Sequence, residues 1–184
     1  MIRIFDILFS FFGLLILSQI IIVLLIIGFF YTGSPIFRQE RVGKNKQPFN
    51  LYKFRSMHIN TKSVATHLAN VSSITPFGRF LRKSKLDELP QLWNVFIGDM
   101  SLVGPRPNLF NQEELIVERD TRGVYSVRPG ITGLAQINKI DMSTPQLLAE
   151  TDAKMINHLN VWYYFKYIFL TLFGKGFGDR IKQT

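Results

Sequence analysis

The sequence predicts a mainly helical α+β protein, in which a long apolar N-terminal helix precedes a small helix-rich domain. Three observations predict this class. No charged residue occurs from Ile7 through Phe37, two short segments after this run alternate apolar and polar residues, and apolar residues recur at spacings of three and four through much of the remainder. The 184 residues are enough for one compact domain and one appendage. We place the appendage at residues 1–36 and the domain at residues 37–184.

The uncharged run is long enough for a membrane. Its central part, ILFSFFGLLILSQIIIVLLIIGFFY, would form a helix roughly 38 Å long at ~1.5 Å per residue. A cleaved signal peptide has a shorter apolar region and a cleavage site, so we interpret the run as a permanent membrane element. Basic residues flank it: Arg3, Arg38, Arg41, Lys44 and Lys46. Because basic residues next to a membrane segment usually remain on the cytoplasmic side, we expect the domain on the cytoplasmic face of the inner (cytoplasmic) membrane.

Two topologies fit this run. A straight span would put Met1 outside, whereas a helix that bends midway would return to the cytoplasmic face. Ser18 and Gln19 are the only polar pair in the middle of the run. Either Ser18 bonds back to a helix carbonyl and Gln19 pairs locally, or the pair marks a bend. Because no proline or glycine pair is present to cause a kink, the residues alone favour the unbent helix.

The domain begins with a predicted hairpin and continues mainly with helices. Alternation in PIFRQER and FNLYKFRSM predicts two short strands. INTKSVATHLANVSS predicts a loop with some helix, and TPFGRFLRKSKLDELPQLWNVFIGDM predicts two helices that meet near Ser84. SLVGPRP predicts an extended turn, NQEELIVERDTRGVYSV a helix ending at Gly123, and RPGITGLAQIN a loop. The remainder, from STPQLL onward, predicts two helices.

The last apolar segment, Trp162 to Phe173, would cover only roughly 18 Å as a helix, too short for a membrane core of ~30 Å. It is rich in Trp and Tyr, which favour membrane interfaces. A buried core helix is the alternative. We favour an amphipathic helix in the headgroup layer, because polar residues accompany the aromatic ones.

The composition limits the function classes. With 22 Lys and Arg against 13 Asp and Glu, the net charge of +9 implies an anionic partner: nucleic acid, a membrane surface or a phosphorylated substrate. The positive charge is not collected on one helix and no nucleic-acid motif occurs, so we expect no nucleic acid. The absence of cysteine excludes disulfides and cysteine-ligated zinc. The histidines show no metal-ligand spacing: His58, His67 and His158.

Two adjacent carboxylates, Asp87 and Glu88, lie close to Pro90 in SKLDELPQLWNVFIGDMSLVGPRP, among several basic residues. Proline lacks an amide hydrogen and is tolerated only in the first turn of a helix, so we expect a helix that begins close to Asp87 and runs towards Gly98. Both carboxylates are then expected to be ionised at the positive end of that helix. Adjacent helical residues point about 100° apart, so the two cannot share a proton and must have different roles.

The pair has a structural and a functional interpretation. Acidic residues are ordinary in a first turn, and the S-x-x-D pattern from Ser84 is a common cap. An ionised carboxylate among arginines can instead attack phosphorus, while the second carboxylate holds a metal ion that neutralises a diphosphate leaving group. The surplus of cations, the arginine–proline turns GPRP and VRPG and the membrane attachment favour function.

Three segments, YKFRSM, RKSKLDELPQLWNVFIGDMSLVGPRP and VRPGITGLAQIN, in this order after an apolar N-terminus, resemble the bacterial sugar transferases. These are small monotopic phosphoglycosyl transferases that begin the assembly of surface glycans, and the resemblance covers nearly the whole chain. It implies transfer of a sugar 1-phosphate from a UDP-sugar to a polyprenol phosphate, with release of UMP. It also implies two displacements through a covalent phosphosugar intermediate, and a requirement for Mg²⁺.

The resemblance assigns a role to each matching residue. Asp87 would be the nucleophile, and Glu88 would bind Mg²⁺ and help to position the diphosphate. The expected substrate-binding residues are basic: Arg82 for the active-site loop and the phosphates, Arg106 and Arg128 for the donor, and Lys53 and Arg55 for polyprenol phosphate at the membrane face. Family members commonly carry Ser-Pro in mid-helix, which breaks it into a re-entrant hairpin, whereas this chain has Ser18–Gln19. We still expect the re-entrant form.

A second function class fits part of the sequence. A non-enzymatic membrane-anchored adaptor, or lipid-binding protein, would use the polybasic stretch after the apolar run to bind anionic lipid. This class explains the charge but not the Asp87–Glu88 pair or the arginine turns. Membrane lipids are expected partners in both classes. The sequence leaves the oligomeric state open, a homodimer included, and it does not name the sugar.

Overall fold

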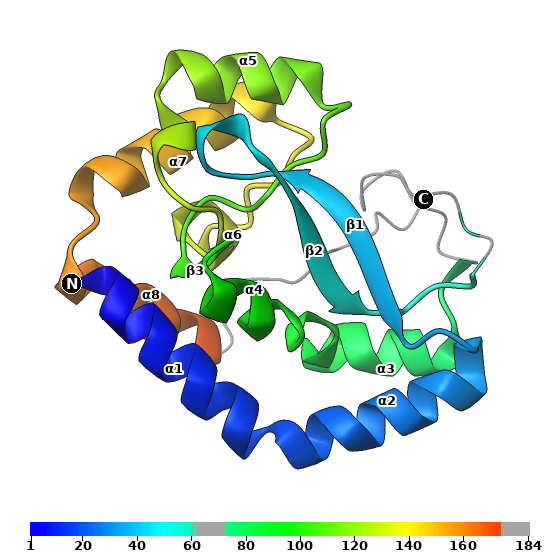
Figure 1. The fold of residues 1–184 in the computed structure, drawn as a ribbon. Helices are drawn as coiled ribbons and strands as arrows, with labels where there is room; N and C mark the ends of the chain where they lie inside the picture. The colour runs from blue at the N-terminus through cyan, green and yellow to red at the C-terminus, as the bar shows by residue number, and fades with distance from the viewer. Residues whose placement is uncertain (60, 62–72, 174–184) are drawn as a thin grey trace.

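The computed structural model describes residues 1–59, 61 and 73–173, and Figure 1 shows its fold. Most of the expected loop INTKSVATHLANVSS, with His67, lies outside the described residues. The described elements follow in chain order: α1 (Ile2–Ile16), α2 (Ser18–Thr32), β1 (Ile36–Val42), η1 (Lys44–Lys46), β2 (Pro48–Phe54), α3 (Pro76–Ser84), η4 (Leu86–Glu88), α4 (Gln91–Ile97), β3 (Ser101–Val103), α5 (Glu113–Thr121), η5 (Val124–Ser126), β4 (Gly130–Thr132), α6 (Leu134–Ile137), α7 (Pro145–His158) and α8 (Val161–Leu172). The predicted class, mainly helical α+β, is confirmed.

The predicted hairpin is present as β1 and β2. The strands pair antiparallel, with Ile36 opposite Phe54 and Val42 opposite Pro48. Leu51 and Phe54 are buried, and Phe54 contributes to a cluster that reaches α2 and α3. The hairpin therefore joins the N-terminal helices to the rest of the domain (Figure 1).

The two helices expected to meet near Ser84 are α3 and α4. Thr75 begins α3, and its hydroxyl accepts a hydrogen bond from the Gly78 amide. The helix ends at Ser84, and Lys85 follows in the left-handed conformation, with φ 59°. This residue turns the chain into η4, which separates the two helices.

A short parallel pair of strands replaces the expected loop at RPGITGLAQIN. Ser101 pairs with Gly130, and Val103 with Thr132. A side chain at Gly130 would overlap the backbone of Gly104. The two segments can approach this closely because both residues are glycine. Strands of three residues are too short for alternation to indicate them, which is why the sequence predicted a loop here. The pairing brings the GPRP and VRPG turns together.

The last two helices, α7 and α8, agree with the prediction. Tyr164 and Tyr167 of α8 are buried, whereas Trp162 and Phe169 are exposed. The helix therefore has features of both predicted alternatives, the core helix and the interfacial helix. One face packs in the core, and the other face is apolar and exposed.

The N-terminal run forms two helices that bend by 62° at a break, although no proline is present. Among the described residues no single helix is long and apolar enough to cross a membrane, whereas the pair meets that test together. The Ser18 hydroxyl donates to the Leu15 carbonyl at 2.7 Å, as predicted, and the Gln19 side chain is exposed. The unbent helix favoured by the residues alone is wrong.

Contacts with the domain hold both arms of this bent pair. Arg3 in α1 donates to the carbonyls of Val95 and Phe96 at 2.6 and 2.9 Å. In α2, Leu24 is buried in a cluster with Phe54 and Leu81. The bend thus follows from tertiary packing on α4 and the hairpin, which local sequence does not indicate.

Candidate active site

Asp87 and Glu88 lie on the 3₁₀ turn η4, before α4. The amide of Glu88 donates to the Lys85 carbonyl at 3.2 Å, and the amide of Leu89 to Leu86 at 3.2 Å. The helix expected to begin close to Asp87 begins instead at Gln91, with Pro90 as its N-cap. The reason is local: Pro90 has no amide hydrogen, so the chain forms i to i−3 bonds before the α-helix starts.

The capping explanation for the pair does not hold. Ser84 is the last residue of α3, and its hydroxyl donates to the carbonyls of Phe80 and Leu81 at 2.8 and 3.1 Å. The turn that carries the pair has no side-chain cap. Asp87 is nevertheless buried, with 5% exposure. A carboxyl that neither starts an α-helix nor faces solvent needs another explanation.

Two cations from distant parts of the chain meet Glu88. Its Oε1 lies 2.9 Å from Nη2 of Arg106, in the turn after β3, and 3.7 Å from Nζ of Lys53, on β2. The three side chains are only 11 to 20% exposed. At this degree of burial the charges are weakly screened, so Glu88 interacts strongly with both cations.

Arg82 offers a hydrogen-bond donor without a protein partner. Its Nε donates to the Ser56 hydroxyl at 2.8 Å. Its Nη1 is buried, and no residue in the described part of the chain accepts a hydrogen bond from it. Buried donors of this kind are unusual and often belong to a ligand site. Ser56 lies in the segment YKFRSM but was not among the predicted site residues.

Two of the predicted site residues make hydrogen bonds to backbone carbonyls of other elements. Nε of Arg128 donates to the Gly98 carbonyl at 2.7 Å, at the C-terminal end of α4. Arg55 donates to the Ser34 carbonyl at 2.8 Å, at the junction of α2 and β1. The structure thus joins Lys53, Glu88 and Arg106 directly. The donor role of Arg128 and the acceptor role of Arg55 stay predictions.

The carboxylates of the candidate site could bind a metal ion only together with the phosphates of a substrate. Among the described residues no group of three or more His, Asp or Glu side chains is arranged to hold an ion. Mg²⁺ in phosphoryl-transfer sites is usually bound by one or two carboxylates together with substrate phosphates. Glu88 can supply one such carboxylate, so the residues present fit Mg²⁺ that is held mainly by the phosphates of a diphosphate.

The chain matches the model of a known family, described as bacterial sugar transferase, over residues 1–176. It is 38% identical over 183 residues to the uncharacterized sugar transferase EpsL of Bacillus subtilis, covering 99% of this chain and 90% of that protein. It is 42% identical to the UDP-glucose:undecaprenyl-phosphate glucose-1-phosphate transferase of Escherichia coli over 80% of this chain and 34% of that one. The galactosyl transferase CpsE of Streptococcus agalactiae is 39% identical over 76% of this chain and 34% of its own. The chain thus spans about a third of the last two proteins.

Proposed function

The chain belongs to the bacterial sugar transferase family, and we propose that it transfers a sugar 1-phosphate from a UDP-sugar to a polyprenol phosphate, with release of UMP. One observation carries the proposal: Glu88, next to the buried Asp87, is paired with Arg106 and Lys53. A carboxyl placed beside a cationic cluster is suited to a reaction in which phosphate oxygens must be held close to an anionic nucleophile.

The reaction has two displacements at the phosphorus that carries the sugar. In the first, a carboxylate oxygen of Asp87 forms a bond to this phosphorus, and the bond to the bridging oxygen breaks. UMP leaves with that electron pair, and an acyl phosphate sugar remains on Asp87. In the second, an oxygen of polyprenol phosphate attacks the same phosphorus, and the bond between this phosphorus and the Asp87 oxygen breaks. The carboxylate is restored, and the product is polyprenol diphosphate sugar.

The cationic side chains hold the donor during these steps. The free Nη1 of Arg82 is available for a phosphate oxygen, and Arg106 and Lys53 offset the charge of Glu88 and of the diphosphate. Mg²⁺, when bound through Glu88 and the diphosphate, would supply further neutralisation of the leaving group.

The same proposal places the protein on the cytoplasmic face of the inner membrane. Large apolar side chains are exposed on several helices: Ile4, Leu8, Phe12, Ile22, Ile26, Phe30, Phe80, Trp93, Trp162 and Phe169. Figure 1 shows α1, α2 and α8 along one side of the molecule. An apolar surface of this extent is suited to lipid, and the acceptor is itself a lipid.

A UMP-release assay with polyprenol phosphate and a panel of UDP-sugars tests the proposal. The names of the similar proteins refer to different sugars, glucose and galactose, so the panel includes UDP-glucose and UDP-galactose. We expect UMP only when both the donor and the acceptor are present, and with one or a few of the sugars. Binding of anionic vesicles without UMP release from any donor would favour the adaptor instead.

A further inference from the structure

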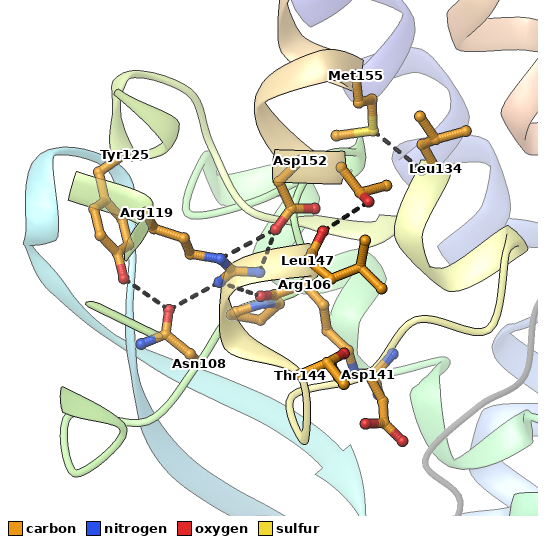
Figure 2. A network of polar contacts seen from close by, with 12 residues as sticks. Arg106, Asn108, Arg119, Tyr125, Leu134, Asp141, Thr144, Leu147, Asp152 and Met155 are labelled. Atoms are coloured by element: carbon orange, nitrogen blue, oxygen red, sulfur yellow. Dashed lines mark hydrogen bonds and ion pairs between the residues drawn. The ribbon is translucent and has the colours of Figure 1, made fainter. Parts of the chain in front are cut away.

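A buried ion pair connects α5 and α7 (Figure 2). Nε and Nη2 of Arg119 lie 3.1 and 2.6 Å from Oδ2 of Asp152. The two side chains are 1% and 0% exposed. Burial raises the pKa of the Asp152 carboxyl, and the charge of Arg119 opposes that shift.

Such a pair requires an explanation other than stability. Removing two charges from water is costly, and apolar replacements of a buried ion pair are often neutral or stabilising. A pair kept at this cost can serve to fix a conformation. The question is therefore which group the pair holds in place.

The group it holds is the main chain of Arg106. Nη1 of Arg119 donates to the Arg106 carbonyl at 2.8 Å and to Oδ1 of Asn108 at 2.9 Å. The hydroxyl of Tyr125 also donates to this Oδ1, at 3.0 Å. Figure 2 shows Arg119 between Asp152 on one side and Asn108 and Arg106 on the other. The ion pair orients the guanidinium that makes these contacts.

The neighbouring carbonyls of this turn are held as well. The amide of Gly130 donates to Pro105, Nη1 of Arg41 to Pro107 and the amide of Val42 to Asn108, at 2.8, 3.2 and 2.9 Å. Prolines on both sides of Arg106 further restrict its backbone. The main chain is thus held while the Arg106 side chain reaches Glu88 at 2.9 Å.

We propose that Arg119 and Asp152 are positioning residues for the transfer reaction: they fix the main chain of Arg106 so that its guanidinium meets Glu88 beside the nucleophile. This inference rests on the proposed function. It extends the site to α5 and α7, two helices that carry no residue assigned to the donor or the acceptor.

The test replaces both charges together, because either one alone would be left buried without its partner. The variant is Arg119→Met with Asp152→Leu. The matched control is Arg122→Met with Glu150→Leu, which removes another ion pair, between the C-cap residue of α5 and α7, at 3.3 Å and partly exposed. We expect the first variant to lower kcat at least tenfold, and the control to stay within twofold of the wild type. A kcat equal to that of the control would overturn the proposal.

A double-mutant cycle separates positioning from a general effect on the fold. In an Arg106→Ala background, the Arg119→Met/Asp152→Leu replacement should change kcat less than twofold, because the residue through which it acts is gone. A full tenfold loss in that background would mean that the pair does not act through Arg106. Melting temperatures of all variants show whether each remains folded.

A second measurement tests whether the ion pair fixes the main chain of Arg106, even if the proposed function is wrong. If the wild type releases no UMP from any donor, the activity is wrong, and amide hydrogen exchange of residues 101–110 then tests the positioning directly. Faster exchange in this segment than in the Arg122/Glu150 control supports the inference. Unchanged exchange there contradicts it.

Discussion

At the scale of single residues, Asp87 gives the most direct test of the covalent reaction. Asp87→Asn keeps the size of the side chain but removes the charged nucleophile, so turnover should fall at least about a thousandfold while the melting temperature changes little. Asp120→Asn, at an exposed carboxyl on α5, is the matched control and should remain active. Near-normal UMP release from Asp87→Asn, in a preparation free of deamidation, would rule out the covalent mechanism.

Glu88 is expected to act differently from its neighbour. Glu88→Gln removes the charge that faces Arg106 and Lys53, so we expect a lower rate and a weaker dependence on Mg²⁺ rather than complete loss. The measurement is the rate of UMP release over a range of Mg²⁺ concentrations, beside Glu113→Gln at an exposed position on α5. A metal dependence identical to that of the wild type would remove Glu88 from the metal site.

Arg128 has a structural contact in addition to its expected role. Arg128→Ala should raise the donor KM if the guanidinium also reaches the donor, and the lost bond to the Gly98 carbonyl should cost about 1 kcal/mol of folding free energy. Donor kinetics and urea unfolding measure the two effects separately. Lower stability with an unchanged donor KM would assign Arg128 to the end of α4 alone.

At the scale of elements, the buried carboxylate of Asp6 makes three of the contacts that hold α1 to the domain. Oδ1 of Asp6 accepts hydrogen bonds from the Ser101 hydroxyl, the Leu102 amide and the Tyr164 hydroxyl, at 3.0, 2.9 and 2.9 Å. Burial, reinforced by the charge of Asp6, raises the pKa of Tyr164. The tyrosine hydroxyl therefore remains a donor throughout the neutral range.

Asp6→Ala should consequently loosen α1. Three donors lose their acceptor, and we expect a loss of about 3 kcal/mol or more, because each unsatisfied buried group costs about 1–3 kcal/mol. Ser10→Ala is the control, since that buried hydroxyl bonds only within α1, to the carbonyls of Asp6 and Ile7. Urea unfolding in detergent gives both values. Equal losses of folding free energy in the two variants would show that the three hydrogen bonds to Asp6 contribute little to stability.

The elements also show what a sequence can predict. The hairpin followed from the alternation of apolar and polar residues, and α7 and α8 followed from apolar residues at helical spacing, which form the buried side of each helix. The β3–β4 pair and the 3₁₀ turn at Leu86–Glu88 did not, since each is only three residues long and depends on partners elsewhere in the chain. The motif identified Glu88, Lys53 and Arg106, but it did not indicate where Arg55 and Arg128 lie. The Arg119–Asp152 pair has no local pattern at all.

At the scale of the whole molecule, the bent N-terminal pair is attached to one domain at both ends. Arg3 and Asp6 fasten the start of α1 to α4, β3 and α8. At the other end, the ring of Tyr31 stacks on Phe77 of α3 with centroids 5.4 Å apart. A straight span would carry the start of α1 across the bilayer and break the first set of contacts, so these contacts favour re-entry.

We therefore expect Met1 and the domain on the same, cytoplasmic, side of the membrane. The test is labelling of intact cells with an impermeant thiol reagent, which is clean because the chain contains no cysteine. One variant carries a cysteine inserted directly after Met1, which is 88% exposed, because Ile2 packs against the core. The reference is Lys44→Cys, in the exposed turn of the hairpin. Both thiols should react only after the membrane is opened. Labelling of the N-terminal cysteine from outside, with the reference still protected, would establish a straight span and would mean that the Arg3 and Asp6 contacts do not form in the membrane.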